Sequence, residues 1–118
     1  MMIHKGLTTD KWFKLSLAEQ LANVGADVGR AIKWKNRGDK EYSSNALDRA
    51  LELLDFTVAD PKNSKHRRRE ILRVREALVD YFMFDNIYDS TDELWENYFY
   101  QFNYAAALRR AQDKLRGR

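Results

Sequence analysis

The chain has 118 residues, of which 44% are hydrophobic and 33% are charged, with one proline and no cysteine. This length suits one domain with its own core, and the composition is that of a helical globular protein, not a disordered one. The absence of cysteine excludes disulfides, thiolate metal sites and cysteine nucleophiles.

Two features of the sequence bear on localisation. No apolar run approaches the roughly 18 residues that a membrane span requires. Residues 1–6 lack the apolar segment of a signal peptide. We therefore expect a cytoplasmic protein with no membrane partner.

Residues 1–15 form a lead-in, with a short helical turn expected at residues 10–13, whose aromatic residues fold back on the core. The first long helix begins at Ser16, because Ser16 and Glu19 have the spacing of a capping box. An apolar stripe of period three to four follows, and Gly38 is suited to end the helix in a left-handed conformation.

The second helix starts after Asp39 as N-cap and ends before Pro61. The third begins near residue 63 or 64 and runs to about residue 86. Its second half is expected to be buried on more than one side, because additional apolar residues widen its stripe: Leu72, Val79, Met83 and Phe84.

The last helix is expected to follow a second capping box at residues 90–93 and to fray at residues 116–118. Its expected core stripe comprises Leu94, Trp95, Tyr98, Phe99, Phe102, Ala105 and Leu108. Four helices of about 20 residues joined by short turns predict an all-α, antiparallel (up-down-up-down) four-helix bundle over residues 1–118. Small residues on the first helix, including Gly25 and Gly29, indicate a close approach by another helix or by a second chain.

The net charge is only +3, but the charges are segregated along the chain. Residues 62–75 carry a local charge of +6, residues 76–96 carry −7, and residues 109–118 carry +4. The up-down order brings the two basic segments to one end of the bundle and the acidic segment to the other, where cations of the first helix can pair with it.

The clustered cations predict a basic pole that binds the phosphates of nucleic acid or another polyanion. The predicted contacts are Lys62, Lys65, Arg67, Arg68, Arg69, Arg73, Arg109 and Arg110. The alternative is a solvated helix end, which suits the last helix, whose C-terminal dipole favours cations. It does not suit residues 67–69, which lie near a helix N-terminus.

Three aromatic residues off the apolar stripes are candidates for a partner interface: Trp34, Tyr100 and Tyr104. The two tyrosines are four residues apart on one helix, and tyrosine is favoured at interfaces. For Trp34, packing against a neighbouring helix is the favoured alternative.

No catalytic or metal-binding constellation is apparent. His4 and His66 lack ligand-spaced partners, and residues 85–96 fail as a calcium loop because Ile87 and Ser90 occupy positions where geometry is strictest. We expect no metal, no cofactor and no enzymatic activity.

Residues 14–25, 49–55 and 75–82 resemble a group of short prokaryotic helical proteins, a resemblance that implies a fold and no activity. In architecture the chain is also similar to accessory variability proteins of diversity-generating retroelements, which are basic oligomeric bundles that bind nucleic acid. A further similarity is to the HEPN superfamily, but its ribonuclease motif is absent, since no arginine precedes His66 at the required spacing.

The leading functional hypothesis is a non-enzymatic adaptor, homo-oligomeric, whose basic pole binds RNA or DNA. The alternative is a protein–protein interaction module that uses the aromatic face of the last helix and has no nucleic-acid role. An RNA-processing enzyme with an unrecognised site is the third reading.

Overall fold

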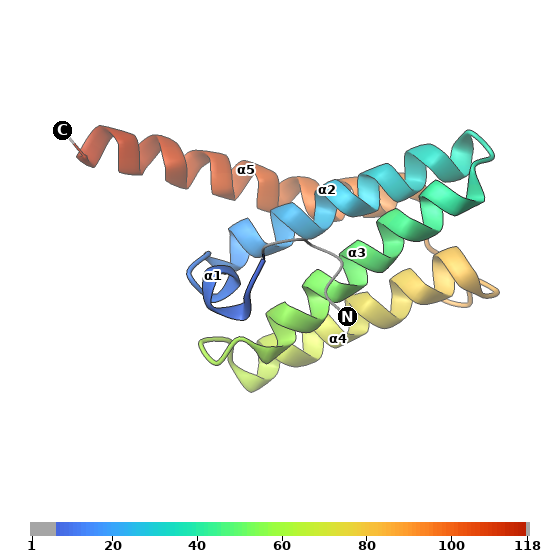
Figure 1. Ribbon diagram of the computed structural model, residues 1–118, viewed down its shortest axis with the longest axis horizontal. Helices are drawn as coiled ribbons and strands as arrows, with labels where there is room; N and C mark the ends of the chain where they lie inside the picture. Colours follow the sequence, from blue (N-terminus) through green and yellow to red (C-terminus); the bar gives the residue numbers. More distant parts are fainter. Residues whose placement is uncertain (1–6, 118) are drawn as a thin grey trace.

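The computed structural model describes residues 7–117. The short helix α1 (Thr9–Phe13) is followed by four long helices: α2 (Leu17–Asn36), α3 (Lys40–Ala59), α4 (Lys65–Met83) and α5 (Asp92–Arg116). The expected all-α fold is confirmed, and the long helices alternate in direction (Figure 1). His4 lies outside the described residues.

The helix starts follow from capping residues in the sequence. Ser16 accepts from the backbone N–H of Glu19, and the Glu19 carboxylate accepts from the backbone N–H of Ser16, which completes the predicted capping box. Asp39 caps α3 as predicted, and Gly38 has the left-handed φ of 81° expected between α2 and α3. Ser64 caps α4.

The predicted second capping box was wrong by one residue. Thr91 caps α5, accepting from the N–H of Leu94, and leucine at that third position cannot return a bond. Ser90 is buried instead and exchanges two hydrogen bonds with the side chain of Asn86.

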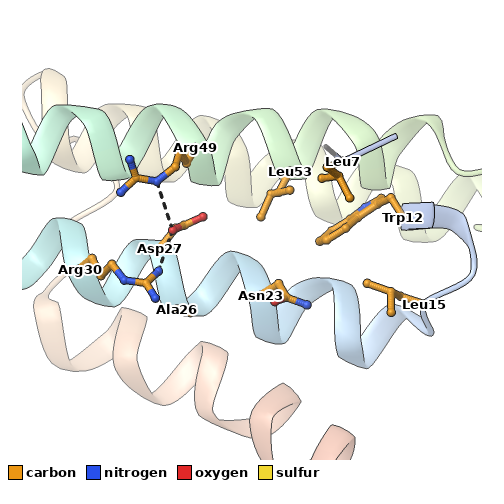
Figure 2. Close-up of a pocket in the computed structure, with 9 residues that line it drawn as sticks. All are labelled: Leu7, Trp12, Leu15, Asn23, Ala26, Asp27, Arg30, Arg49 and Leu53. Carbon is orange, nitrogen blue, oxygen red and sulfur yellow. Dashed lines mark hydrogen bonds and ion pairs between the residues drawn. The ribbon is translucent and has the colours of Figure 1, made fainter. Parts of the chain in front are cut away.

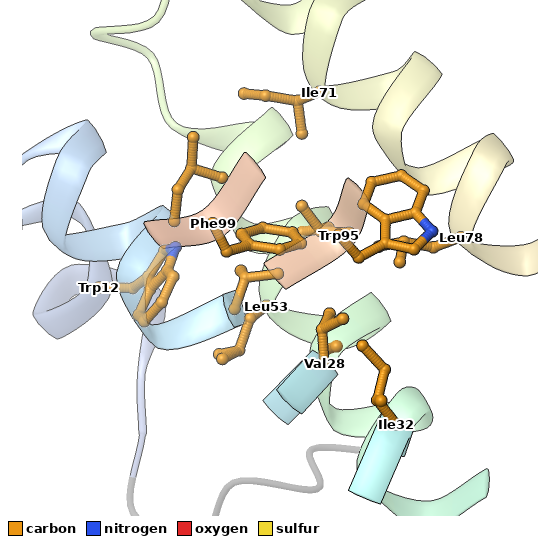
Figure 3. Close-up of a cluster of buried hydrophobic side chains, with 12 residues drawn as sticks. Trp12, Val28, Ile32, Leu53, Ile71, Leu78, Trp95 and Phe99 are labelled. Atoms are coloured by element: carbon orange, nitrogen blue, oxygen red, sulfur yellow. The ribbon is translucent and has the colours of Figure 1, made fainter. Parts of the chain in front are cut away.

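Helix α2 is the centre of the bundle, because it packs against α3 on one side and against α5 on another, while α4 packs on α3. Figure 3 shows the core formed where these helices meet: Trp95 and Phe99 of α5 lie among side chains of the other helices, including Val28, Leu53 and Leu78.

Gly25 explains the close approach of α5 to α2. A Cβ atom built on Gly25 would lie 2.6 Å from the Cβ of Phe99, closer than non-bonded carbon atoms can approach. A Cβ on Gly29 would meet nothing within 4 Å. The small residues of α2 therefore serve packing within the chain at Gly25 but not at Gly29.

The lead-in folds back on the core as expected. Trp12 of α1 is buried, and its indole Nε1 donates to the hydroxyl of Thr57, 3.0 Å away on α3. Gln20, fully buried on α2, donates to the carbonyl of Trp12 and to the carboxylate of Asp60. These hydrogen bonds attach α1 to the end of the bundle at which α2 begins and α3 ends.

At the opposite end of the bundle, a salt bridge connects α2 and α5, as the segregation of charges along the sequence predicts. Lys35 donates to Asp92 at 2.7 Å and to the hydroxyl of Tyr81 at 2.8 Å, and Tyr81 also bonds to Asp92. Burial disfavours the Asp92 carboxylate, but the hydrogen bonds from Lys35, Tyr81 and Asn36 outweigh it and lower the pKa of Asp92.

Two predictions about burial were wrong. The added apolar residues of α4 are not buried on a second side: Leu72, Met83 and Phe84 are exposed. On α5, Trp95 and Phe99 of the predicted stripe are buried and Tyr98 and Phe102 are partly buried against the core. Leu94, Ala105 and Leu108 are exposed, and Ala106, which was not predicted, is buried. In both cases the sequence pattern marks an apolar face that is wider than the part that neighbouring helices bury.

None of the helices in residues 7–117 is long and apolar enough to cross a membrane.

Candidate interaction surfaces

The last ten residues of α5, residues 107–116, are all exposed and extend past the rest of the bundle (Figure 1). We call them the tail. At 1.5 Å per residue, α5 is about 37 Å long and α2, its partner, about 30 Å. The longer helix therefore runs beyond its neighbour where α2 begins.

The exposed side of α5 carries an apolar stripe that continues into the tail. Tyr104, Leu108, Ala111 and Leu115 follow one another at intervals of four, three and four residues, which places them on one side of the helix. Tyr104 is 60% exposed and Leu115 is 77% exposed. Tyr100, one turn earlier, is also exposed. The two tyrosines predicted as partner contacts are thus accessible.

The tail is basic around this stripe, with Arg109, Arg110, Lys114 and Arg116 against Asp113. The charges of Arg109 and Arg110 interact electrostatically with the carboxylate of Glu19 at the start of α2. Hydrogen bonds from Ser16, and then the charges of these two arginines, lower the pKa of Glu19. Both arginines keep exposed side chains.

Three of the predicted phosphate contacts near the start of α4 have partners within the chain. Lys62 donates to the carbonyl of Phe13 at 2.7 Å and forms an ion pair with buried Asp60. Arg67 pairs with Glu70 at 2.8 Å, and Arg68 donates to the Asp60 carbonyl. These contacts explain why cations occupy the first turns of α4, where the helix dipole disfavours them.

Arg67 and Glu70 also lie beside α5. Burial and the Glu70 carboxylate raise the pKa of Tyr98 to about 12, and the charge of Arg67 opposes the rise.

Lys65, Arg69 and Arg73 are exposed on α4 and form no ion pair with any residue in 7–117. The start of α4 and the tail lie at the same end of the bundle, as the up-down order requires. They point in different directions from it, however (Figure 1). The predicted basic pole is therefore two separate basic segments, each of which keeps exposed arginines.

Trp34 is half-buried and packs against α3, which was the favoured alternative. Its ring lies 5.2 Å from that of Tyr42, and the cations of Lys33 and Arg37 lie over it at 5.5 and 5.4 Å. Because neighbouring side chains cover it, Trp34 is less available to a partner than the tyrosines of α5.

A groove that no sequence pattern predicted lies between the exposed side of α4 and the turn that leads to α5. It encloses about 590 Å³. Its lining residues are Leu72, Arg75, Glu76, Val79, Asp80, Phe84, Asp85, Ile87 and Tyr88. The apolar residues on its rim are strongly exposed, with Phe84 at 70% and Ile87 at 77%.

The turn that forms one wall of the groove is held by buried Asp80. Its carboxylate accepts from the backbone N–H groups of Ile87 and Tyr88, at 3.0 and 3.1 Å. Within the turn, Asn86 and Asp89 adopt left-handed φ angles of 56° and 54°, which these two residue types tolerate. The groove therefore has a wall fixed by hydrogen bonds.

The groove is acidic. Among the described residues that line it, the one cation is Arg75, which is paired with Asp55 at 2.8 Å, so the carboxylates of Glu76 and Asp85 dominate the local charge. The hydroxyl of Tyr88 donates to Glu76 at 3.0 Å, and this carboxylate raises the pKa of Tyr88. Apolar walls with acidic groups around them suit a basic, apolar partner.

A second cavity, of about 480 Å³, lies over α2 and α3 near α1 (Figure 2). Buried Asp27 lies in its wall, with Arg30 at 2.9 Å and Arg49 at 3.6 Å. The sequence signal for this cluster is an aspartate within the apolar stripe of α2. Because two arginines compensate the one carboxylate, the cluster is a salt-bridge network joining α2 and α3.

No family model, curated protein or solved structure matches the chain. The resemblances stated from the sequence therefore stay predictions. Within residues 7–117, no group of three His, Asp or Glu side chains is arranged to hold a metal ion.

Proposed function

We propose that the chain is a helical adaptor that binds a protein partner through the exposed face of α5. The observation that carries the proposal is the apolar stripe of Tyr104, Leu108, Ala111 and Leu115 on a helix that extends beyond its own bundle. Exposed stripes of this spacing are the recognition face of a helix that binds in a groove.

The physical argument concerns the stability of the helical tail. A helix end with no tertiary contacts frays unless packing stabilises it, because helical stability in proteins comes mainly from buried apolar faces. Leu108 and Leu115 are exposed and do not belong to the hydrophobic core formed by the described residues. Their burial in a complex supports both binding and the helical order of the tail.

Photo-cross-linking from the tail tests the proposal. A photoreactive phenylalanine analogue replaces Tyr104 in cells that produce the protein naturally, and the same analogue replaces Tyr42 as the matched control. The two tyrosines are 60% and 58% exposed, but Tyr42 lies on α3. We expect a cross-linked product from position 104 and none from position 42.

Equal cross-linking from both positions, or none from either, contradicts an interaction specific to α5. In that case the stripe has no partner, and the proposed function fails.

A second candidate function is the binding of nucleic acid, and it is favoured by three cations on α4 that form no ion pair with another described residue. Lys65, Arg69 and Arg73 are exposed, and binding of such cations to a phosphate backbone releases counterions. Fluorescence anisotropy with labelled RNA and DNA, at low and at physiological salt, tests it. Arg69→Ala/Arg73→Ala should weaken binding more than Arg67→Ala, because Arg67 is already paired with Glu70.

A further inference from the structure

We infer that the partner of the tail is the acidic groove of a second copy of this chain. The inference rests on the proposed function, because it names the occupant for the same face of α5. Each chain then contributes a basic apolar helix and receives one.

The two surfaces match in spacing. Leu72, Glu76 and Val79 of the groove recur along α4 at intervals of four and three residues, as do Tyr104, Leu108 and Ala111 along α5. Alternating intervals of three and four residues form the seam along which two helices pack side by side. Each series covers seven residue steps, or about 10 Å of helix.

The two surfaces also match in charge. The groove carries Glu76 and Asp85, and Arg75 in its lining is paired with Asp55. The tail carries Arg109, Arg110, Lys114 and Arg116 beside its apolar stripe. Opposite charges around an apolar seam favour encounter and fix the orientation of the partners, whereas tail against tail or groove against groove would bring like charges together.

The tail cannot reach the groove of its own chain. The groove is formed partly by Ile87 and Tyr88, which precede the first turn of α5, and the tail is the last part of the same helix. The length of α5 therefore separates them, and they lie at opposite ends of the molecule (Figure 1). A second copy supplies the missing contact, and reciprocal docking of two copies closes a dimer.

Sedimentation velocity of the purified full-length chain tests the inference. We expect a mass above the monomer value of 14.0 kDa that rises with concentration. Leu108→Asp in the tail and Ile87→Asp in the groove should each weaken self-association at least tenfold. Asn45→Asp, which adds the same charge to an exposed position of α3, should leave it unchanged.

Mixing the two variants gives the sharpest result. Leu108→Asp keeps an intact groove and Ile87→Asp keeps an intact tail, so one productive contact is available between unlike chains. We expect a one-to-one heterodimer that neither variant alone matches as a homodimer. Circular dichroism of each variant checks that the helices are intact.

Three outcomes overturn the inference. A wild-type chain that stays monomeric at all concentrations has no docking of this kind. A mixture of the variants that stays monomeric excludes the pairing of tail with groove. Self-association lost in Leu108→Asp but retained in Ile87→Asp places the tail against another surface. In each case a cross-link from position 104 to any protein still supports the proposed function, so the two failures are distinguishable.

Discussion

The two halves of α5 have similar apolar content but opposite surroundings. In the first half, Trp95 and Phe99 are each 3% exposed and pack among side chains of α2, α3 and α4. In the tail, Leu108 and Leu115 of the same continuous helix are 47% and 77% exposed. The difference shows that one helix divides its apolar residues between folding the chain and presenting a surface.

Truncating the Phe99 side chain should have the largest effect on the free energy of unfolding, and it should distinguish the buried half of α5 from the exposed half. Phe99→Ala removes a buried ring and leaves a cavity between α2 and α5, so the free energy of unfolding should fall by about 3–5 kcal/mol. Leu108→Ala removes exposed atoms and should change it by less than about 0.5 kcal/mol. Urea unfolding followed by circular dichroism, at concentrations where the chain is monomeric, measures both.

Comparable losses at the two positions would mean that the tail packs on its own bundle. The division of α5 into a buried half and an exposed half would then be wrong.

Replacing the glycines of α2 by alanine should have a smaller effect on the free energy of unfolding. Gly25→Ala places a Cβ against the side chain of Phe99, and separating the helices should cost about 1–3 kcal/mol. Gly29→Ala, one turn along the same helix, meets nothing within 4 Å and should stabilise the chain by up to about 1 kcal/mol, since alanine is the better helix former.

The same unfolding assay compares the two alanine variants. Opposite signs at two glycines four residues apart would confirm that the close contact of α2 with α5 is local to Phe99. Destabilisation of equal size at both would point to a general intolerance of side chains on α2.

Much of the fold could be predicted from local sequence. Ser16 with Glu19, Asp39 and Gly38 mark helix boundaries through hydrogen bonds and φ angles that involve only neighbouring residues. Alternating helix direction follows from short turns. The all-α bundle therefore needs little information beyond capping residues and apolar periodicity.

The candidate surfaces could not be predicted in the same way. An apolar stripe has the same period whether another helix or solvent covers it, so the pattern predicts burial for Leu108 and Leu72, which are exposed. Which stripes are covered depends on how far each helix extends beside its neighbour. Likewise, the partners of Lys62 and Arg68 come from tertiary contacts with Asp60, which no local pattern in the basic segment indicates.

The smallest effect on the free energy of unfolding should come from the start of α5, where Asp92 bonds to Lys35 and Asn36 of α2. Hydrogen bonds from Lys35, Tyr81 and Asn36 outweigh burial and hold the pKa of Asp92 below its unfolded value of 3.8. Its contribution to stability is therefore present above about pH 4 and is lost as the pH falls through the folded pKa. Asp92→Asn should cost about 1 kcal/mol at pH 7, because the pair is partly exposed. The difference in the free energy of unfolding between Asp92→Asn and wild type should shrink as the pH is lowered from 4 to 2, measured by urea unfolding.

Glu96→Gln removes an exposed carboxylate of the same helix and should show no such difference at any pH. A constant gap between Asp92→Asn and wild type across this range would mean that the carboxylate contributes through its shape and not its charge, and that the buried half of α5 is held by packing alone.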